Sequence, residues 1–112
     1  MAETFKLKTK ASATTALTDV YTVPASTSTV VIGCALTNKT ASNITADLQV
    51  VTASSTGENA DDVYLTKGVL IPAADSLEII EGKVALEAGD KIKVLASAGS
   101  ALDVALSVLE IS

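Results

Sequence analysis

The chain is made of short stretches in which apolar and polar residues alternate. Residues 44–51, Ile-Thr-Ala-Asp-Leu-Gln-Val-Val, change between apolar and polar at almost every step, and a period of two is typical of a strand with one buried face. Turn residues, such as the cluster at 38–43, separate these runs at intervals of about 8 to 12 residues. The pattern predicts eight or nine strands, at residues 4–10, 18–23, 29–37, 44–51, 63–71, 76–80, 83–86, 91–97 and 102–111.

This pattern predicts an all-β fold, a single compact antiparallel β-sandwich. It leaves open whether the strand order is jelly-roll or immunoglobulin-like. With 112 residues, residues 1–112 are expected to form one domain, in which residues 1–13 are an N-terminal arm or an edge strand. Hydrophobic residues make up 48% of the chain and aromatic residues only 3%. The core is therefore expected to consist of Val, Ile, Leu and Ala, which suits two closely facing sheets.

Three segments carry more specific expectations. Residues 29–37 are apolar or small on both faces, which favours a central strand that is covered on both sides. Residues 23–32 and 71–80 share an apolar strand end, a Pro-Ala step, a short polar crossing and a new strand. Each is interpreted as a corner where the chain leaves one sheet, because proline cannot continue the hydrogen-bond ladder.

The last strand changes phase near its end. The apolar residues at 102, 104, 106 and 108 share one face, whereas Leu109 and Ile111 fall on the other. Either a bulge returns Leu109 and Ile111 to the core, or both faces are covered at this end, with a neighbouring subunit as the cover.

Charge and composition exclude several kinds of partner. The net charge of −5, with eight Lys or Arg against thirteen Asp or Glu, argues against nucleic acid, whose binding relies on clustered cations. No apolar run approaches the length of about 20 residues needed to span a bilayer, and the first residues lack the apolar segment of a signal peptide. We therefore expect a soluble product made in the cytoplasm. Cys34, the single cysteine, is expected to be a small buried hydrophobe rather than a reactive or intermolecular thiol.

Catalytic chemistry is poorly represented. The chain has no His, which removes the usual general acid–base groups and Ser-His-Asp arrangements. Glu58, Asp61 and Asp62 gather in the predicted loop at 52–61 and could bind Ca²⁺ through oxygen, but their spacing matches no EF-hand. We expect a solvated loop facing water or a neighbour, no cofactor, no metal site and no enzymatic activity.

The first predicted strand has two unlike faces. Lys6, Lys8 and Lys10 lie on one face, and Phe5 lies on the other. One interpretation is that the lysines guard an edge strand against pairing with another sheet. The alternative is a basic stripe that docks on an acidic partner surface.

Several sequence motifs resemble those of a known class of proteins. They are Tyr-Thr-Val-Pro-Ala-Ser-Thr at 21–27 with the strand and turn at 30–38, Ile-Pro-Ala at 71–73, residues 82–94, and residues 104–110. In this order they resemble the small virion structural proteins of tailed phages, in particular marine and cyanobacterial phages, over most of the chain after residue 18. These motifs shape turns, so no catalytic or binding residue carries over from the resemblance.

The resemblance implies a non-enzymatic β-sandwich of the virion, most often a capsid decoration (cement) protein. We expect a homotrimer on the capsid surface whose partner is the major capsid protein. The segment at 4–10, with Phe5 and its lysines, and the terminal Leu109 and Ile111 are the expected contacts. The alternative is a tail, head-fibre or adaptor module that binds a host receptor or acts in assembly; the scarcity of aromatic residues in the loops counts against receptor binding.

Overall fold

The computed structural model describes residues 3–52, 63–79 and 84–112, which form nine strands in two antiparallel sheets. The strands are β1 (Glu3–Ala13), β2 (Thr18–Thr22), β3 (Ser28–Asn38), β4 (Ile44–Val51), β5 (Val63–Ile71), β6 (Ser76–Glu78), β7 (Val84–Leu86), β8 (Lys91–Ala96) and β9 (Leu102–Ile111). These ranges contain no helix, so no membrane-spanning helix is found among them. The predicted all-β sandwich is confirmed.

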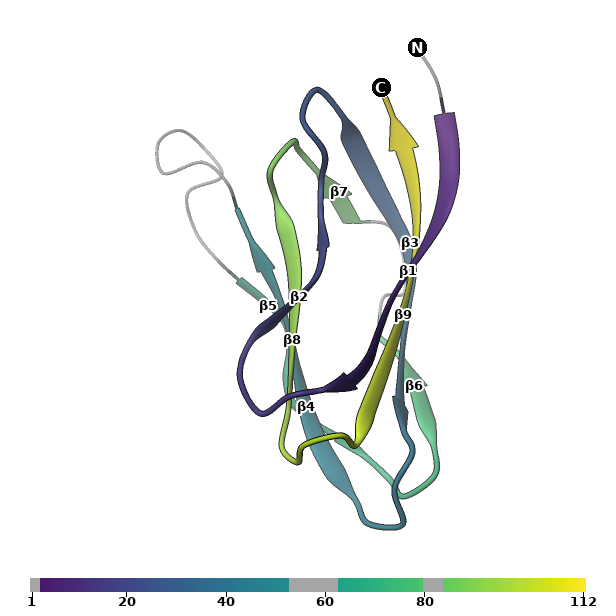
Figure 1. The fold of residues 1–112 in the computed structure, drawn as a ribbon, viewed down its shortest axis with the longest axis vertical. Helices are drawn as coiled ribbons and strands as arrows, with labels where there is room; N and C mark the ends of the chain where they lie inside the picture. Colours follow the sequence, from purple (N-terminus) through teal and green to yellow (C-terminus); the bar gives the residue numbers. More distant parts are fainter. Residues whose placement is uncertain (1–2, 53–62, 80–83) are drawn as a thin grey trace.

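The two sheets lie as two layers with the N- and C-terminal strands side by side (Figure 1). Sheet one has the order β1-β9-β3, with β6 and β7 both pairing along the far edge of β3, and sheet two has the order β2-β8-β4-β5. The pairs are nested: β1 with β9, β2 with β8, β3 with β6 and β7, and β4 with β5. Nested pairing is the jelly-roll order. An immunoglobulin-like order would instead place the first two strands next to each other in one sheet.

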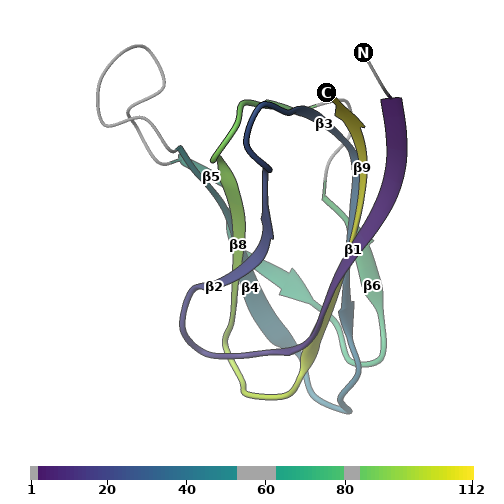
Figure 2. The same ribbon diagram turned by 45° about the horizontal axis from the view of Figure 1, so that its top comes forward.

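The two predicted corners are confirmed. The chain passes from β2 in sheet two to β3 in sheet one, and from β5 in sheet two to β6 in sheet one, as Figure 2 also shows from a second direction. Two residues after the proline of each corner, Ser26 and Ala74 take positive φ angles of 59° and 58°. The repeated Pro-Ala motif therefore encodes the same turn at both corners.

The core lies between the sheets and is aliphatic, as predicted. In β4, the inward Ala46, Leu48 and Val50 are buried, which confirms the strand with one buried face. Cys34 is also fully buried, as predicted. Burial, with a further contribution from the charge of Glu78, raises the pKa of its thiol to about 12, which removes the thiolate that a reactive cysteine needs.

Sheet one contains two bulges, and neither is where the sequence suggested one. One lies in β1 between Lys10 and Ala13, and the other lies in β3 at Ile32. The pairing of β9 with both neighbours is regular from residue 108 to residue 111. The interpretation that a bulge returns Leu109 and Ile111 to the core is therefore wrong, and both stay on the outer face, half-buried.

The strand predicted at 29–37 is central in its sheet, as expected, since β3 pairs with β9 on one side and with β6 and β7 on the other. Its outer face is not covered, however, because Ile32 is 39% exposed. The apolar residues of β3 therefore lie on a buried inner face and on an outer face that stays accessible.

Candidate interaction surface

The edge strand β1 presents its apolar side chains outward. In its register with β9, Phe5 lies opposite Leu109, and Lys6 lies opposite the fully buried Val108. Directly opposed residues share a face of the sheet, so Phe5 points to the outside and Lys6 points inward. Phe5 is 73% exposed and Leu7 is 64% exposed. Lys6, although on the inner side, keeps a side chain that is 42% exposed. The strand therefore departs from the usual arrangement in that its apolar residues are not buried.

Neighbouring strands extend this apolar display. Val30 on β3 lies opposite Leu109, and Ile111 follows at the end of β9. We name the resulting surface the apolar face. It consists of Phe5, Leu7, Val30, Ile32, Leu109 and Ile111.

The apolar face contains a hollow. A space of about 330 Å³ is lined by Phe5, Leu7, Ile32 and the small Ser107, together with Lys6 and Val108. Its large side chains stand on β1 and β3, while the small Ser107 lies on β9 between these strands. The hollow therefore has apolar side chains on two sides and a small polar residue between them.

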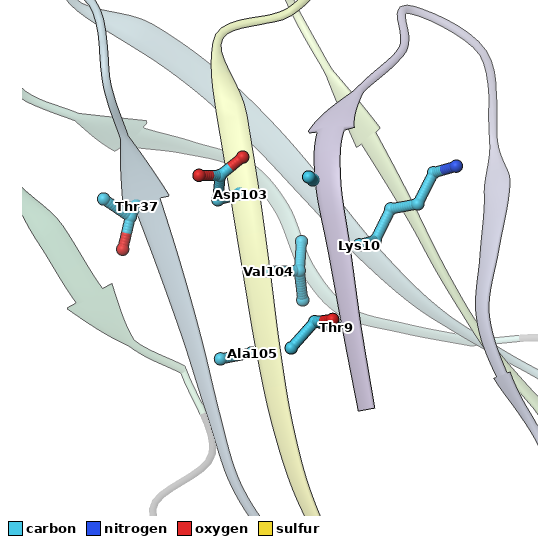
Figure 3. A pocket seen from close by; sticks show the side chains of 7 residues that line it. Thr9, Lys10, Thr37, Asp103, Val104 and Ala105 are labelled. Atoms are coloured by element: carbon cyan, nitrogen blue, oxygen red, sulfur yellow. The ribbon is translucent and has the colours of Figure 1, made fainter. Parts of the chain in front are cut away.

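Further along β9 the outer face becomes polar. A second hollow of about 210 Å³ is lined by residues that include Thr9, Thr37, Asp103 and Ala105 (Figure 3). The side chain of Lys10 extends away from β9 in the same view. Apolar contact is thus concentrated in the half of sheet one that carries both chain ends.

The three lysines predicted as partner contacts lie on the inner side of β1. The Lys6 ammonium is 2.8 Å from Glu110 Oε1, and the Lys8 ammonium lies 5.9 Å from the centre of the Tyr21 ring. Lys10 lies opposite the buried Val104. The structure therefore brings Phe5, Leu109 and Ile111 together and separates them from Lys6, Lys8 and Lys10.

Three residues of the apolar face, Leu7, Val30 and Ile32, were not named among the predicted contacts. Leu7 shares a face with Phe5 by simple alternation, so the sequence carried a signal for it. Val30 and Ile32 lie on the strand that was expected to be covered on both sides, so the sequence did not mark them as accessible.

A buried polar cluster joins the inner side of β1 to three other strands. Glu110 accepts a hydrogen bond of 2.5 Å from the Tyr21 hydroxyl, which also lies 2.8 Å from Thr29 Oγ1. Lys6 and then Tyr21 lower the pKa of the Glu110 carboxyl. Burial, followed by Glu110, raises the pKa of Tyr21 to about 12. Through Lys6 and Tyr21, Glu110 therefore links β9 to β1 and β2.

A second set of polar contacts surrounds the β1 bulge. The Ser12 backbone N–H donates to Asp103 Oδ1 at 2.9 Å, and Lys39 Nζ lies 3.0 Å from the same oxygen. Lys39 also donates to Ser12 Oγ at 2.7 Å. The Ser12 N–H and then Lys39 hold the pKa of Asp103 below its usual value. Ser12 itself has a positive φ of 53°.

Within the described ranges alone, no three His, Cys, Asp or Glu side chains come together in a way that could hold a metal ion. The carboxylates Glu58, Asp61 and Asp62, with most of the predicted loop at 52–61, lie outside the described residues. No family model matches the chain, and neither the curated proteins nor the solved structures contain a match. The apolar face is the strongest candidate for a functional site.

Proposed function

We propose that this protein is a non-enzymatic structural component of a tailed-phage virion, a capsid decoration protein that docks on the assembled shell and stabilises it. The observation that carries the proposal is the apolar face. A β-strand that turns Phe5 and Leu7 to solvent while Lys6 points inward favours a partner surface over a free one. The resemblance to virion proteins supplies the kind of partner, the major capsid protein.

The size of the apolar face determines how such docking works. It spans three strands about 4.8 Å apart and about three residue pairs along them, which gives an area on the order of 300 Å². A typical stable interface buries about 800 Å² on each partner. At about 25 cal/mol per Å², 300 Å² contributes about 7 kcal/mol, which is comparable to the cost of association.

A single copy is therefore expected to bind weakly through this face alone. We propose that it acts as a homotrimer on the capsid surface, where several linked contacts bind with higher avidity than one. Because docking buries surface only on the assembled shell, bound copies shift the equilibrium toward that shell by mass action.

The test is binding of the purified protein to expanded capsids that lack it, with copy number counted by quantitative mass spectrometry. We expect saturable binding at many symmetric sites and a higher capsid melting temperature. The double variant Phe5→Ser/Leu7→Ser should bind about tenfold more weakly or worse, since central apolar contacts contribute 1 kcal/mol or more each.

The matched control is Leu70→Ser, because Leu70 is 55% exposed but lies in sheet two, on β5. It should bind like the unchanged protein. Failure to bind shells, with retention on tails or on host cells, would overturn the decoration role and leave the tail, head-fibre or adaptor alternative. Equal binding by the double variant and the control would show that the apolar face is not the docking surface.

A further inference from the structure

The outward display of Phe5 and Leu7 depends on one extra residue in β1. Ala13 lies opposite Leu102, and a regular ladder counted back from this pair would place Leu7 opposite Val108. The observed partner of Leu7 is Ser107. The bulge between Lys10 and Ala13 accounts for this shift of one residue, and a shift of one exchanges the two faces of a strand.

We infer that this bulge, held by Asp103 and Lys39, sets the register that displays the apolar face. Asp103, Lys39 and Ser12 are then positioning residues: they touch no partner but determine which face of β1 a partner meets. The inference about register stands on the strand pairing alone, and its consequence for docking rests on the proposed function.

The bulge is contacted by side chains from two other parts of the chain. Asp103 reaches it from β9 and Lys39 reaches it from the turn after β3, and both bond to Ser12. Ser12 adopts a left-handed backbone conformation, which L-residues adopt only at a cost. Two polar side chains bond to this one strained residue, which indicates that the sequence determines the position of the bulge. Bulges of this kind commonly re-aim side chains.

The alternative register is the one that the strand sequence alone favours. If every residue of β1 paired in a regular ladder without a bulge, Phe5 and Leu7 would share a face with the buried Val108, and the lysines would point to solvent. That arrangement is the normal pattern for an edge strand. The Lys6–Glu110 ion pair, which needs Lys6 on the inner side, acts with the bulge against it.

Cross-strand disulfides can report the register directly. In a Cys34→Ala background, the pair Leu7→Cys/Ser107→Cys should cross-link on treatment with oxidised glutathione, because directly opposed residues lie within disulfide distance. The pair Lys8→Cys/Ser107→Cys should not. When Asp103→Ala removes the side chain that holds the bulge, the Lys8 pair should gain cross-linking at the expense of the Leu7 pair. An unchanged Leu7 pair in this variant would overturn the role of Asp103 in setting the register. Deletion of Ala11 is the matched comparison, because a regular ladder counted back from Ala13 then keeps Leu7 opposite Ser107, and the Leu7 pair should still cross-link.

A control pair and a second variant keep the test decisive. Thr45 and Leu70 are opposed on sheet two, so cysteines there should cross-link in every variant and report a folded chain. Should Asp103→Ala abolish this control cross-link, Lys39→Ala replaces it, because Lys39 contacts both Asp103 and Ser12. There too the Lys8 pair should gain cross-linking at the expense of the Leu7 pair, and an unchanged Leu7 pair would contradict the role of these contacts.

Capsid binding separates this inference from the proposed function. A re-registered chain that cross-links through Lys8 should lose binding to shells as completely as Phe5→Ser/Leu7→Ser does. A reversed cross-link with undiminished shell binding would confirm the register and overturn the apolar face as the docking surface.

Discussion

At the scale of single residues, the side chain of Asn38 holds together the corner between the sheets. Its Nδ2 donates to the carbonyl oxygens of Ser42, Ile71 and Pro72 at 2.7, 3.1 and 3.2 Å. Its Oδ1 accepts hydrogen bonds from the backbone N–H and the hydroxyl of Thr40. The sequence placed Asn38 in a turn cluster but could not reveal this role, because two of the bonded carbonyls lie more than 30 residues away.

We expect Asn38→Ala to lower the free energy of unfolding by about 2–4 kcal/mol, since several buried polar groups lose their partner at once. Urea denaturation measures this difference. Asn43→Ala is the control, because its exposed Oδ1 accepts a hydrogen bond from Ala73 N, and it should cost about 1 kcal/mol or less. Equal losses for the two variants would contradict the importance of the Asn38 contacts.

The hydroxyl of Tyr21 should make stability depend on alkaline pH. Its pKa is raised from 10.0 to about 12 in the folded protein by burial and by Glu110. A raised pKa means that the neutral hydroxyl stabilises the fold fully below about pH 10. This contribution is lost as the pH rises from about 10 to about 12.

Comparison with Tyr21→Phe isolates that contribution from the titration of lysines. Near neutral pH the unchanged protein should be more stable by about 1–3 kcal/mol, the usual contribution of a hydrogen bond to a charged group. The difference should shrink steadily above pH 10 when denaturation is repeated along a pH series. A difference that stays constant to pH 12 would be inconsistent with a buried, bonded hydroxyl.

At the scale of elements, strands with regular alternation could be predicted, whereas the bulges in β1 and β3 could not. In β4, alternation identified both the strand and its buried face. In β1 it separated Phe5 from Lys6 correctly but carried no information on which side faces inward. That choice depends on Asp103, whose contact with Ser12 spans 91 residues of sequence. A contact between residues so far apart in the sequence leaves no local pattern in the sequence of β1.

The pairing of β5 with β4 shifts by one residue between Thr66 and Val69, and this bulge offers a direct test at this scale. Gly68 has a φ of 68°, and its N–H donates to Asp47 Oδ1 at 2.6 Å. An added Cβ would meet no atom within 4 Å, so Gly68→Ala should cost only the backbone strain of about 1–2 kcal/mol.

Gly99→Ala is the matched control, because its Cβ would also meet open space and its φ lies outside the left-handed region. It should change the free energy of unfolding by less than about 0.5 kcal/mol. Thermal and urea denaturation of both variants provide the measurement. Equal stabilities would show that β5 relaxes to a regular strand when Gly68 is replaced.

At the scale of the whole molecule, the fold class and both corners followed from turn chemistry, whereas the strand order did not. Pro24 and Pro72 end strands in sheet two and direct the chain into sheet one, and each signal is local in the sequence. Nested pairing joins strands as distant as β1 and β9. It depends on which apolar faces fit together, and alternation alone does not specify this.

The distribution of charge over the molecule predicts how docking responds to salt. The centre of the apolar face carries no charged side chain, and Lys6 is already paired with Glu110. Binding to shells through this face should therefore change little between about 0.1 M and 1 M sodium chloride, where the Debye length falls from about 10 Å to about 3 Å. Docking through a basic stripe of Lys6, Lys8 and Lys10 would instead weaken steeply over the same range.

Sedimentation of shells with bound protein at increasing salt measures the difference. Lys10→Gln provides the control, since it should leave binding unchanged if the apolar face is the contact. A steep loss of binding with salt, together with weaker binding of Lys10→Gln, would transfer the docking role from the apolar face to the lysines.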